Sequence, residues 1–219
     1  MRIIFDLDGT LIDSAPDIHA AGNAVLLAEG LAPIPYEQAR SFIGNGARVF
    51  LERLERASAG ANDPPRTERL RRLFAVQYER AHALTRPYPG VVEAMASLRE
   101  QGWRLGLCTN KPIAPTRAVL AHLRWTPFFD VLVGGDTLPV MKPDPAPLLK
   151  AMRSLGDGPL VYVGDSEVDA ATAVAAGVPF ALFTEGYRKT PVDTIPHDRA
   201  FADWVELPDL AAQLARKVG

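Results

Sequence analysis

The sequence predicts an α/β protein, in which a doubly wound parallel sheet carries an inserted helical subdomain. Three observations support this fold class. The chain opens on a short apolar run, and from residue 87 onward similar runs alternate with longer amphipathic segments. Residues 16–86, by contrast, contain helical patterns but no strand-like run. Alternating strands and helices are typical of a parallel sheet with right-handed crossovers.

The strands are predicted from short runs that are apolar almost throughout, the pattern of strands covered on both faces. These runs are RIIFDLD (2–8), RLGLCT (104–109), FDVLVGGD (129–136), LVYVGD (160–165) and PFALFT (179–184). Amphipathic segments with glycine stop signals separate the later runs and predict the crossover helices. These segments are 91–102, 112–123, 144–156 and 167–177. The core is therefore expected to be Rossmann-like.

The inserted subdomain is predicted to contain three helices, at about 17–30, about 36–58 and about 65–86. A connection of about seventy residues without a strand exceeds an ordinary crossover. Helices that simply pack on the sheet are the alternative interpretation. The predicted division is a core of residues 1–15 and 87–219 and a helical unit of residues 16–86.

Composition excludes several classes of protein. The 219 residues carry a formal net charge of −2, which gives neither a basic footprint for nucleic acid nor a polybasic membrane patch. The single cysteine, Cys108, permits no internal disulfide and is expected to be an inert core thiol. Asp6 and Asp8 interrupt the opening run too early for a signal peptide, and no run could span a bilayer. We expect a cytoplasmic protein, without nucleic-acid or membrane partners.

Polar residues follow the predicted strands at the point where each strand ends. Asp6 and Asp8 end the first strand, Thr109-Asn110 follow the second, and Asp165 ends LVYVG. Lys142 follows the strand at 129–136. The carboxyl ends of parallel strands meet at one edge of a sheet, where open α/β folds bind their ligands. The sequence therefore predicts a site at this edge.

The charges of these residues indicate the chemistry of the site. Asp6 and Asp8 are two residues apart, so an extended strand directs both to the same side. Two carboxylates about 4 Å apart repel by about 4 kcal/mol at an effective dielectric near 20, and Asp165 adds to the repulsion. Such an oxygen-rich cluster favours Mg²⁺. With Lys142 and the donors of Thr109-Asn110, it suits a phosphoryl group.

Two aspartates can then divide the work of phosphoryl transfer. One carboxylate can attack phosphorus and form an aspartyl phosphate. The other can protonate the leaving oxygen and afterwards deprotonate the incoming water. The pattern of residues leaves open which aspartate does which.

The residues resemble the motifs of the haloacid dehalogenase-like phosphatases, in the same order and at compatible separations. The matching motifs are DLDGT (6–10), TN (109–110), Lys142 in KP, and GDSEVD (164–169). The resemblance implies that Asp6 is the nucleophile and Asp8 the general acid and base, with Lys142 as the fixed cation. It also implies that Mg²⁺ is held by Asp6, the Asp8 main-chain carbonyl and Asp165.

Three further residues are expected to support these ligands. The resemblance places Asp169, one helical turn beyond Asp165, behind the metal, together with Thr10. Ser166 is expected either to orient water on the metal or to cap the following helix. The helical unit looks like the small cap of this family, with hinges near Ala15-Pro16 and Arg86-Pro87. Such a cap can exclude water and select the leaving group.

Among capped members, the chain is similar to the bacterial phosphoglycolate phosphatases. The stretches that carry this likeness are DGTLIDSAPDI (8–18), FIGNGARVFLERL (42–54), PYPGV (87–91) and GGDTLPVMKPDPAPLL (134–149). Gly44, Asn45 and Gly46 are expected to approach the substrate through their main chain, and Arg48 to pair with its carboxylate. The alternative is that Gly44-Asn45-Gly46 only joins two helices and that Arg48 is solvated.

The resemblance implies hydrolysis of 2-phosphoglycolate, a small phosphorylated metabolite, by a monomer or homodimer. Hydrolysis of a sugar phosphate, a nucleotide or pyrophosphate is the nearest alternative. A phosphomutase is disfavoured by Thr10, where mutases commonly carry a bulkier apolar residue, and a dehalogenase is disfavoured by Asp8. A catalytically silent binding protein is disfavoured because every motif position is filled. We expect Lys111 to be a solvated lysine at a helix start, the alternative being a contact with phosphate. Asp136 is expected to be a turn or capping residue, the alternative being that it orients Lys142.

Overall fold

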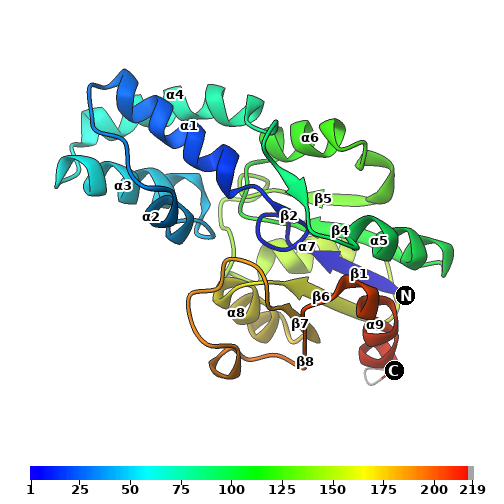
Figure 1. Cartoon of the computed structure of the whole chain (residues 1–219). Helices are drawn as coiled ribbons and strands as arrows, with labels where there is room; N and C mark the ends of the chain where they lie inside the picture. Colours follow the sequence, from blue (N-terminus) through cyan, green and yellow to red (C-terminus); the bar gives the residue numbers. More distant parts are fainter. Residues whose placement is uncertain (217–219) are drawn as a thin grey trace.

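A six-stranded parallel sheet forms the centre of the computed structural model, which describes residues 1–216 (Figure 1). The strand order is β5-β4-β1-β6-β7-β8, and every neighbouring pair runs parallel. The strands are β1 (Arg2–Phe5), β4 (Arg104–Cys108), β5 (Val131–Val133), β6 (Leu160–Gly164), β7 (Phe180–Phe183) and β8 (Arg199–Phe201). The predicted α/β fold class is confirmed.

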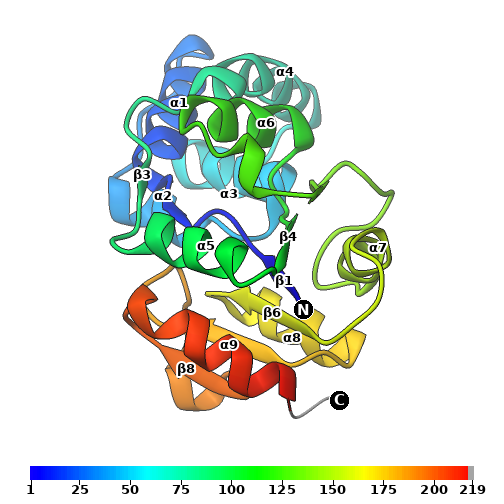
Figure 2. The same cartoon turned by 90° about the vertical axis from the view of Figure 1, so that its right-hand side faces the viewer.

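Helices cover both faces of this sheet (Figure 2). One face packs against α5 (Val91–Glu100), α6 (Ile113–His122) and α9 (Leu207–Arg216). The other face packs against α7 (Ala146–Ser154) and α8 (Glu167–Ala176). The central strand β1 shows the alternation that this requires, since Ile3 and Phe5 join the first core cluster and Ile4 joins the second.

The last part of the fold was not predicted from the sequence. Strand β8 is only three residues long and has one fully buried side chain, Phe201, so it lacks the continuous apolar run of the other strands. Helix α9 follows it and closes the first face of the sheet. Three short 3₁₀ turns complete the core: η1 (Thr126–Phe128), η2 (Val192–Thr194) and η3 (Trp204–Glu206).

Four helices form a separate bundle beside the carboxyl edge of the sheet (Figure 1). They are α1 (Ala15–Ala28), α2 (Tyr36–Ser41), α3 (Gly46–Ala59) and α4 (Pro64–Arg80). Side chains such as Val25, Leu54 and Phe74 give the bundle its own hydrophobic cluster. No helix within residues 1–216 is both long and apolar enough to cross a membrane.

Two of the predicted helices in this unit have wrong boundaries. The helix expected at about 36–58 is interrupted between α2 and α3, where Gly44 (φ 114°) adopts a backbone conformation that a helix cannot contain, and α3 then starts at Gly46 (φ 81°). The helix expected to reach residue 86 ends at Arg80. The segment after Arg80 is bound to Asp17, whose carboxylate accepts hydrogen bonds from the N–H groups of Leu84 (3.0 Å) and Thr85 (2.6 Å).

A two-stranded ribbon joins the bundle to the sheet. Strand β2 (Ile12–Asp13) leads into α1, and β3 (Arg86–Pro87) leads back, and the two pair antiparallel. The two connections between bundle and sheet therefore lie side by side. The range expected for the core ends at residue 219, but residues 217–219 lie outside the described chain.

Candidate active site

The carboxyl edge of the sheet holds a small cavity between the sheet and the helical bundle. Asp6 and Asp8 follow β1, and Thr109 follows β4. Strand β1 is hydrogen-bonded to β4 on one side and to β6 on the other. The cavity has a volume of about 40 Å³ and is lined from the sheet side by these residues with Asn110, Lys111, Lys142 and Ser166. From the bundle it is lined mainly by the apolar side chains of Ile18, Ile43, Phe50 and Phe74.

Three buried aspartates lie next to this cavity, within reach of one another. Carboxylate oxygens of Asp6, Asp165 and Asp169 lie within 4.8 Å of each other. Burial raises the pKa of Asp6 to about 6, against the opposing effect of Lys142. Burial, with the charges of Asp169 and Asp6, also raises the pKa of Asp165 well above its usual range. Such a cluster is stabilised by any cation that it can bind.

Asp165 is held between two loops that each approach it with a glycine. Its carboxylate accepts hydrogen bonds from the Thr10 hydroxyl (2.6 Å) and from the Tyr187 N–H (2.6 Å). A Cβ atom at Gly9 would lie 2.5 Å from one of its oxygens, and a Cβ at Gly186 would lie 2.3 Å from its own Cβ. Two loops therefore approach this carboxylate as closely as glycine alone permits.

Asp169 has both carboxylate oxygens occupied by protein donors. One oxygen accepts hydrogen bonds from Lys142 Nζ (2.6 Å) and from the Tyr162 hydroxyl (2.6 Å). The other accepts from the Ser166 hydroxyl (2.6 Å) and the Ser166 N–H (3.2 Å). Burial alone would raise the pKa of Asp169, but Lys142 and the hydrogen bonds outweigh it and lower the pKa. Asp169 therefore acts through Lys142 and Ser166 and has little capacity left for a metal ion.

Ser166 is the N-cap residue of α8. Its hydroxyl accepts from the Asp169 N–H at 3.4 Å, and the Asp169 side chain bonds back to the Ser166 N–H, which is a capping box. Of the two roles considered for Ser166, the structure shows the capping role.

Asp6 is the carboxylate with an unused oxygen. Its Oδ1 atom is buried and lies 2.9 Å from Lys142 Nζ, an ion pair by distance, but it has no hydrogen-bond donor within residues 1–216. Asp165 keeps free lone pairs beside its two accepted hydrogen bonds. Hard carboxylate oxygens of this kind fit a divalent cation. Asp6 and Asp165 can therefore hold a metal ion while Asp169 stays with Lys142.

Lys142 is the fixed cation of the site. It is buried, and its ammonium contacts Asp6, Asp169 and the Tyr162 hydroxyl. Burial alone would lower the pKa of Lys142, but Asp169 and Asp6 outweigh it and raise the pKa above the ordinary value for lysine. The side chain stays charged at any physiological pH.

Asp8 is not part of the aspartate cluster and pairs with Lys111. Its Oδ1 accepts hydrogen bonds from the Ser14 hydroxyl (2.6 Å) and from Lys111 Nζ (3.1 Å). Lys111 is only 4% exposed and also donates to the Tyr78 hydroxyl of α4 (2.8 Å). The expectation of a solvated Lys111 is therefore wrong, because the bundle covers this lysine and supplies a partner for it.

Asn110 joins the sheet to the bundle. Its amide nitrogen donates to the carbonyl oxygens of Gly44 and Lys142, both at 3.0 Å, and its amide oxygen accepts from the Lys142 N–H (3.0 Å). Both N–H bonds of the amide are in use, so Asn110 has no side-chain donor free for a substrate. Thr109 accepts from the Lys111 N–H (3.2 Å) and keeps its hydroxyl hydrogen for a ligand.

The GNGAR segment divides between the cavity and the surface. Gly44 and Gly46 line the cavity, whereas Asn45 is the N-cap residue of α3 and is not among the lining residues described. The Arg48 side chain is 73% exposed and pairs with Glu52 (3.1 Å), one turn further along α3. The structure therefore does not bring Arg48 to the site, because its place on the helix directs it to solvent.

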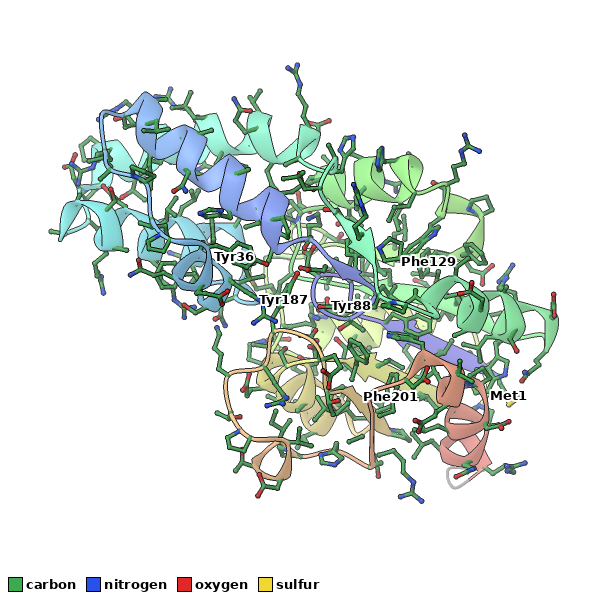
Figure 3. All side chains as sticks on the ribbon, in the orientation of Figure 1. Met1, Tyr36, Tyr88, Phe129, Tyr187 and Phe201 are labelled. Carbon is green, nitrogen blue, oxygen red and sulfur yellow. The ribbon has the colours of Figure 1, made fainter. Side chains whose placement is uncertain are left out.

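Tyr187 is a residue of the site that sequence analysis missed. It lies in the loop after β7, between the bundle and the sheet (Figure 3). Its hydroxyl accepts from the N–H groups of Ser14 (2.8 Å) and Ala15 (2.9 Å) and donates to Asp13 (2.6 Å). One residue thus holds Asp165 through its main chain and the start of α1 through its side chain. The surrounding TEGYRKT has no motif that could have revealed this role.

Two other expectations are met. Asp136 accepts a hydrogen bond from the Ile113 N–H (2.7 Å) at the start of α6, which is a capping role. Cys108 is fully buried, and burial raises the pKa of its thiol to about 12, so the thiol is inert.

The chain combines an α/β fold with aspartates at the carboxyl edge of the sheet and a helical bundle over them. This combination is typical of hydrolases of the phosphatase type. The model of the haloacid dehalogenase-like hydrolase family matches residues 1–177. The chain belongs to this family.

Curated relatives extend the match to nearly the whole chain. Over 213 residues the chain is 50% identical to a phosphoglycolate phosphatase of Cereibacter sphaeroides (strain ATCC 17029 / ATH 2.4.9), covering 97% of this chain and 98% of the relative. It is 44% identical to a phosphoglycolate phosphatase of Rhodobacter capsulatus, with 95% of both chains covered. A crystal structure described as a predicted phosphoglycolate phosphatase from Haemophilus somnus 129PT has a TM-score of 0.89 at 30% identity, covering 95% of this chain and 96% of that one.

Proposed function

We propose that the chain is a Mg²⁺-dependent phosphomonoester hydrolase that converts 2-phosphoglycolate to glycolate and inorganic phosphate. The observation that carries this proposal is the 50% identity, over nearly the full length, to relatives named phosphoglycolate phosphatase. The cavity supports it, because it brings Asp6, Asp8 and Lys142 together under the helical bundle.

The proposed reaction uses Asp6 and Asp8 in turn. The Asp6 carboxylate attacks phosphorus, the bond from phosphorus to the glycolate oxygen breaks, and Asp8 gives that oxygen a proton. Asp8 then takes a proton from a water molecule, which attacks the aspartyl phosphate and releases phosphate and the free Asp6 carboxylate. Lys142 and the Thr109 hydroxyl face the phosphoryl oxygens and neutralise their charge.

Mg²⁺ is the proposed metal, and the oxygen donors described above fit it. Asp6, Asp165 and the Asp8 main-chain carbonyl are the proposed ligands, and the ion would supply further positive charge to the phosphoryl group. Thr10 orients the carboxylate of Asp165 through its 2.6 Å hydrogen bond.

We also propose that residues 16–86 act as a cap over this site. Besides Lys111 to Tyr78, the contacts that hold the bundle against the sheet side include Asn110 to Gly44, Lys189 Nζ to the Ile43 carbonyl (3.2 Å), and Arg40 to the Gly186 carbonyl (2.9 Å). A closed cap excludes water from the aspartyl phosphate until the leaving group has gone. We further propose that the enzyme is cytoplasmic and acts as a monomer or homodimer on this metabolite.

The test is phosphate release by the purified protein, with Mg²⁺ and with EDTA. 2-Phosphoglycolate is compared with sugar phosphates, nucleotides and pyrophosphate at equal concentration. The proposal expects metal-dependent turnover of 2-phosphoglycolate at a kcat/KM above every other compound. Turnover of another ester instead would keep the mechanism and reject the substrate, and relocation of phosphate without release would indicate a mutase.

A further inference from the structure

The proposed substrate carries two anionic groups, and the cavity has two lysines. Lys111 and Lys142 are the lysines among the residues described as lining it, and it has no arginine there. Lys142 is committed to Asp6 and Asp169 at the phosphoryl end. Lys111 lies on the Asp8 side, where the leaving group must be for Asp8 to protonate it. A second anion on the leaving group therefore meets Lys111.

The Lys111 ammonium has one N–H donor that is not used by the two acceptors shown for it. The ammonium has three N–H bonds, of which one is directed to Asp8 and one to the Tyr78 hydroxyl. The side chain is almost fully buried, so water does not compete freely for the third. A buried ammonium with one carboxylate partner is a strong site for a further anionic oxygen.

Tyr78 offers a second donor, which comes from the bundle and lies next to Lys111. Its oxygen accepts from Lys111, and its own O–H hydrogen is not assigned to any acceptor within the described chain. Burial, followed by the charges of Asp8 and Asp6, raises the pKa of Tyr78 well above its usual range, so the hydroxyl keeps its hydrogen. Tyr78 belongs to α4 of the bundle, and Lys111 follows β4 of the sheet.

We propose that Lys111 and Tyr78 form the subsite that binds the carboxylate of the substrate, an inference that rests on the proposed function. One carboxylate oxygen accepts from Lys111 Nζ and the other from the Tyr78 hydroxyl. The two donors lie side by side, but one belongs to the sheet and the other to the bundle, so the subsite is complete only when the bundle is closed over the sheet. A phosphate ester without a carboxylate does not make these two hydrogen bonds, so it does not stabilise the closed bundle and is the poorer substrate.

This assignment replaces Arg48, which the structure places on the solvent side of α3 in a pair with Glu52. It also explains why the cavity is otherwise apolar on the bundle side. Ile18, Ile43, Phe50 and Phe74 give a leaving group no hydrogen bonds, so the orientation of a small acid depends on Lys111 and Tyr78.

The test compares two substrates that differ only at this end. 2-Hydroxyethyl phosphate keeps the two-carbon ester and replaces the carboxylate of 2-phosphoglycolate by a hydroxyl-bearing carbon. The readout is the ratio of kcat/KM for 2-phosphoglycolate to that for 2-hydroxyethyl phosphate, measured for the parent, Lys111→Gln, Tyr78→Phe and Arg48→Gln. Because Lys111 also touches Asp8, both activities are expected to fall in Lys111→Gln, and the ratio separates the two effects.

We expect the ratio to fall about 10- to 100-fold in Lys111→Gln, the range for one charge-assisted hydrogen bond. In Tyr78→Phe it should fall about 3- to 10-fold, as for a neutral hydrogen bond. Arg48→Gln removes an equal charge from the exposed side and should leave the ratio unchanged. A ratio that falls less than about threefold in Lys111→Gln overturns the subsite.

Two further outcomes are informative. If Lys111→Gln does not fold, Tyr78→Phe, which removes one oxygen atom, decides the question, and an unchanged ratio there rejects the subsite. If the parent enzyme shows no turnover of 2-phosphoglycolate, the proposed function itself fails and the subsite with it. Parent turnover combined with an unchanged ratio in the variants would reject the subsite alone.

Discussion

Replacing Tyr187 by phenylalanine should destabilise the junction between the bundle and the sheet. The substitution removes one oxygen atom, which accepts from the Ser14 and Ala15 N–H groups and donates to Asp13. The Ala15 N–H keeps a longer contact with Asp13 (3.3 Å), but the Ser14 N–H loses the partner shown for it in a buried position. A buried donor left without a partner costs about 1–3 kcal/mol, and the lost hydrogen bond to Asp13 adds to this.

We therefore expect the free energy of unfolding of Tyr187→Phe to be about 2–4 kcal/mol lower than that of the parent. Urea denaturation followed by circular dichroism measures this difference. Tyr36→Phe is the matched control, because Tyr36 is a tyrosine of the bundle whose hydroxyl has no hydrogen bond in residues 1–216, and its loss should cost less than about 0.5 kcal/mol. Equal stabilities of Tyr187→Phe and Tyr36→Phe would refute the assignment of Tyr187 as the residue that holds the start of α1.

Three more predictions concern the carboxylates. Gly186→Ala should raise the Mg²⁺ concentration needed for half-maximal activity about 10- to 100-fold, because the added Cβ would lie 2.3 Å from the Asp165 Cβ. A Mg²⁺ titration of activity measures this concentration, and an unchanged midpoint would contradict the prediction. Lys142→Met should lower the free energy of unfolding by about 3–5 kcal/mol, since Asp169 would remain buried without its cation. Urea denaturation measures this difference, and an unchanged free energy would show that the Lys142–Asp169 ion pair does not stabilise the fold. In metal-free protein, burial raises the pKa of Asp6 to about 6, above the value of about 3.9 in an unfolded chain, so the native state binds more protons in this window. The free energy of unfolding should then fall as the pH rises from about 4 to about 6, and saturating Mg²⁺ should remove this slope in parallel urea titrations.

The sheet and the aspartates could be predicted from the sequence because their signals are local. An apolar run followed by a polar residue predicts both a buried strand and the edge at which it ends. This places Asp6, Asp165 and Thr109 near one another without any knowledge of their contacts. The edge strand β8 was not predicted, because its three residues include one buried side chain and so form no apolar run.

The contacts between the bundle and the sheet could not be predicted, because each depends on residues far apart in the sequence. Lys111 resembles any lysine at a helix start until α4 brings Tyr78 over it, 33 positions away in the sequence. Arg48 looked like a carboxylate ligand from its glycine-rich surroundings, but only the helix direction shows that it faces solvent. Tyr187 contacts the start of α1 from more than 170 positions away in the sequence, and no local pattern records that.

The most direct test of the account compares the parent enzyme with Asp6→Asn on 2-phosphoglycolate, with Mg²⁺ and with EDTA. We expect rapid phosphate release by the parent that requires Mg²⁺, and a loss of nearly all turnover in Asp6→Asn, whose amide cannot attack phosphorus. Far-ultraviolet circular dichroism identical to that of the parent would show that the variant is folded. Turnover by a folded Asp6→Asn at the rate of the parent would contradict the account, because the reaction would then not pass through this carboxylate.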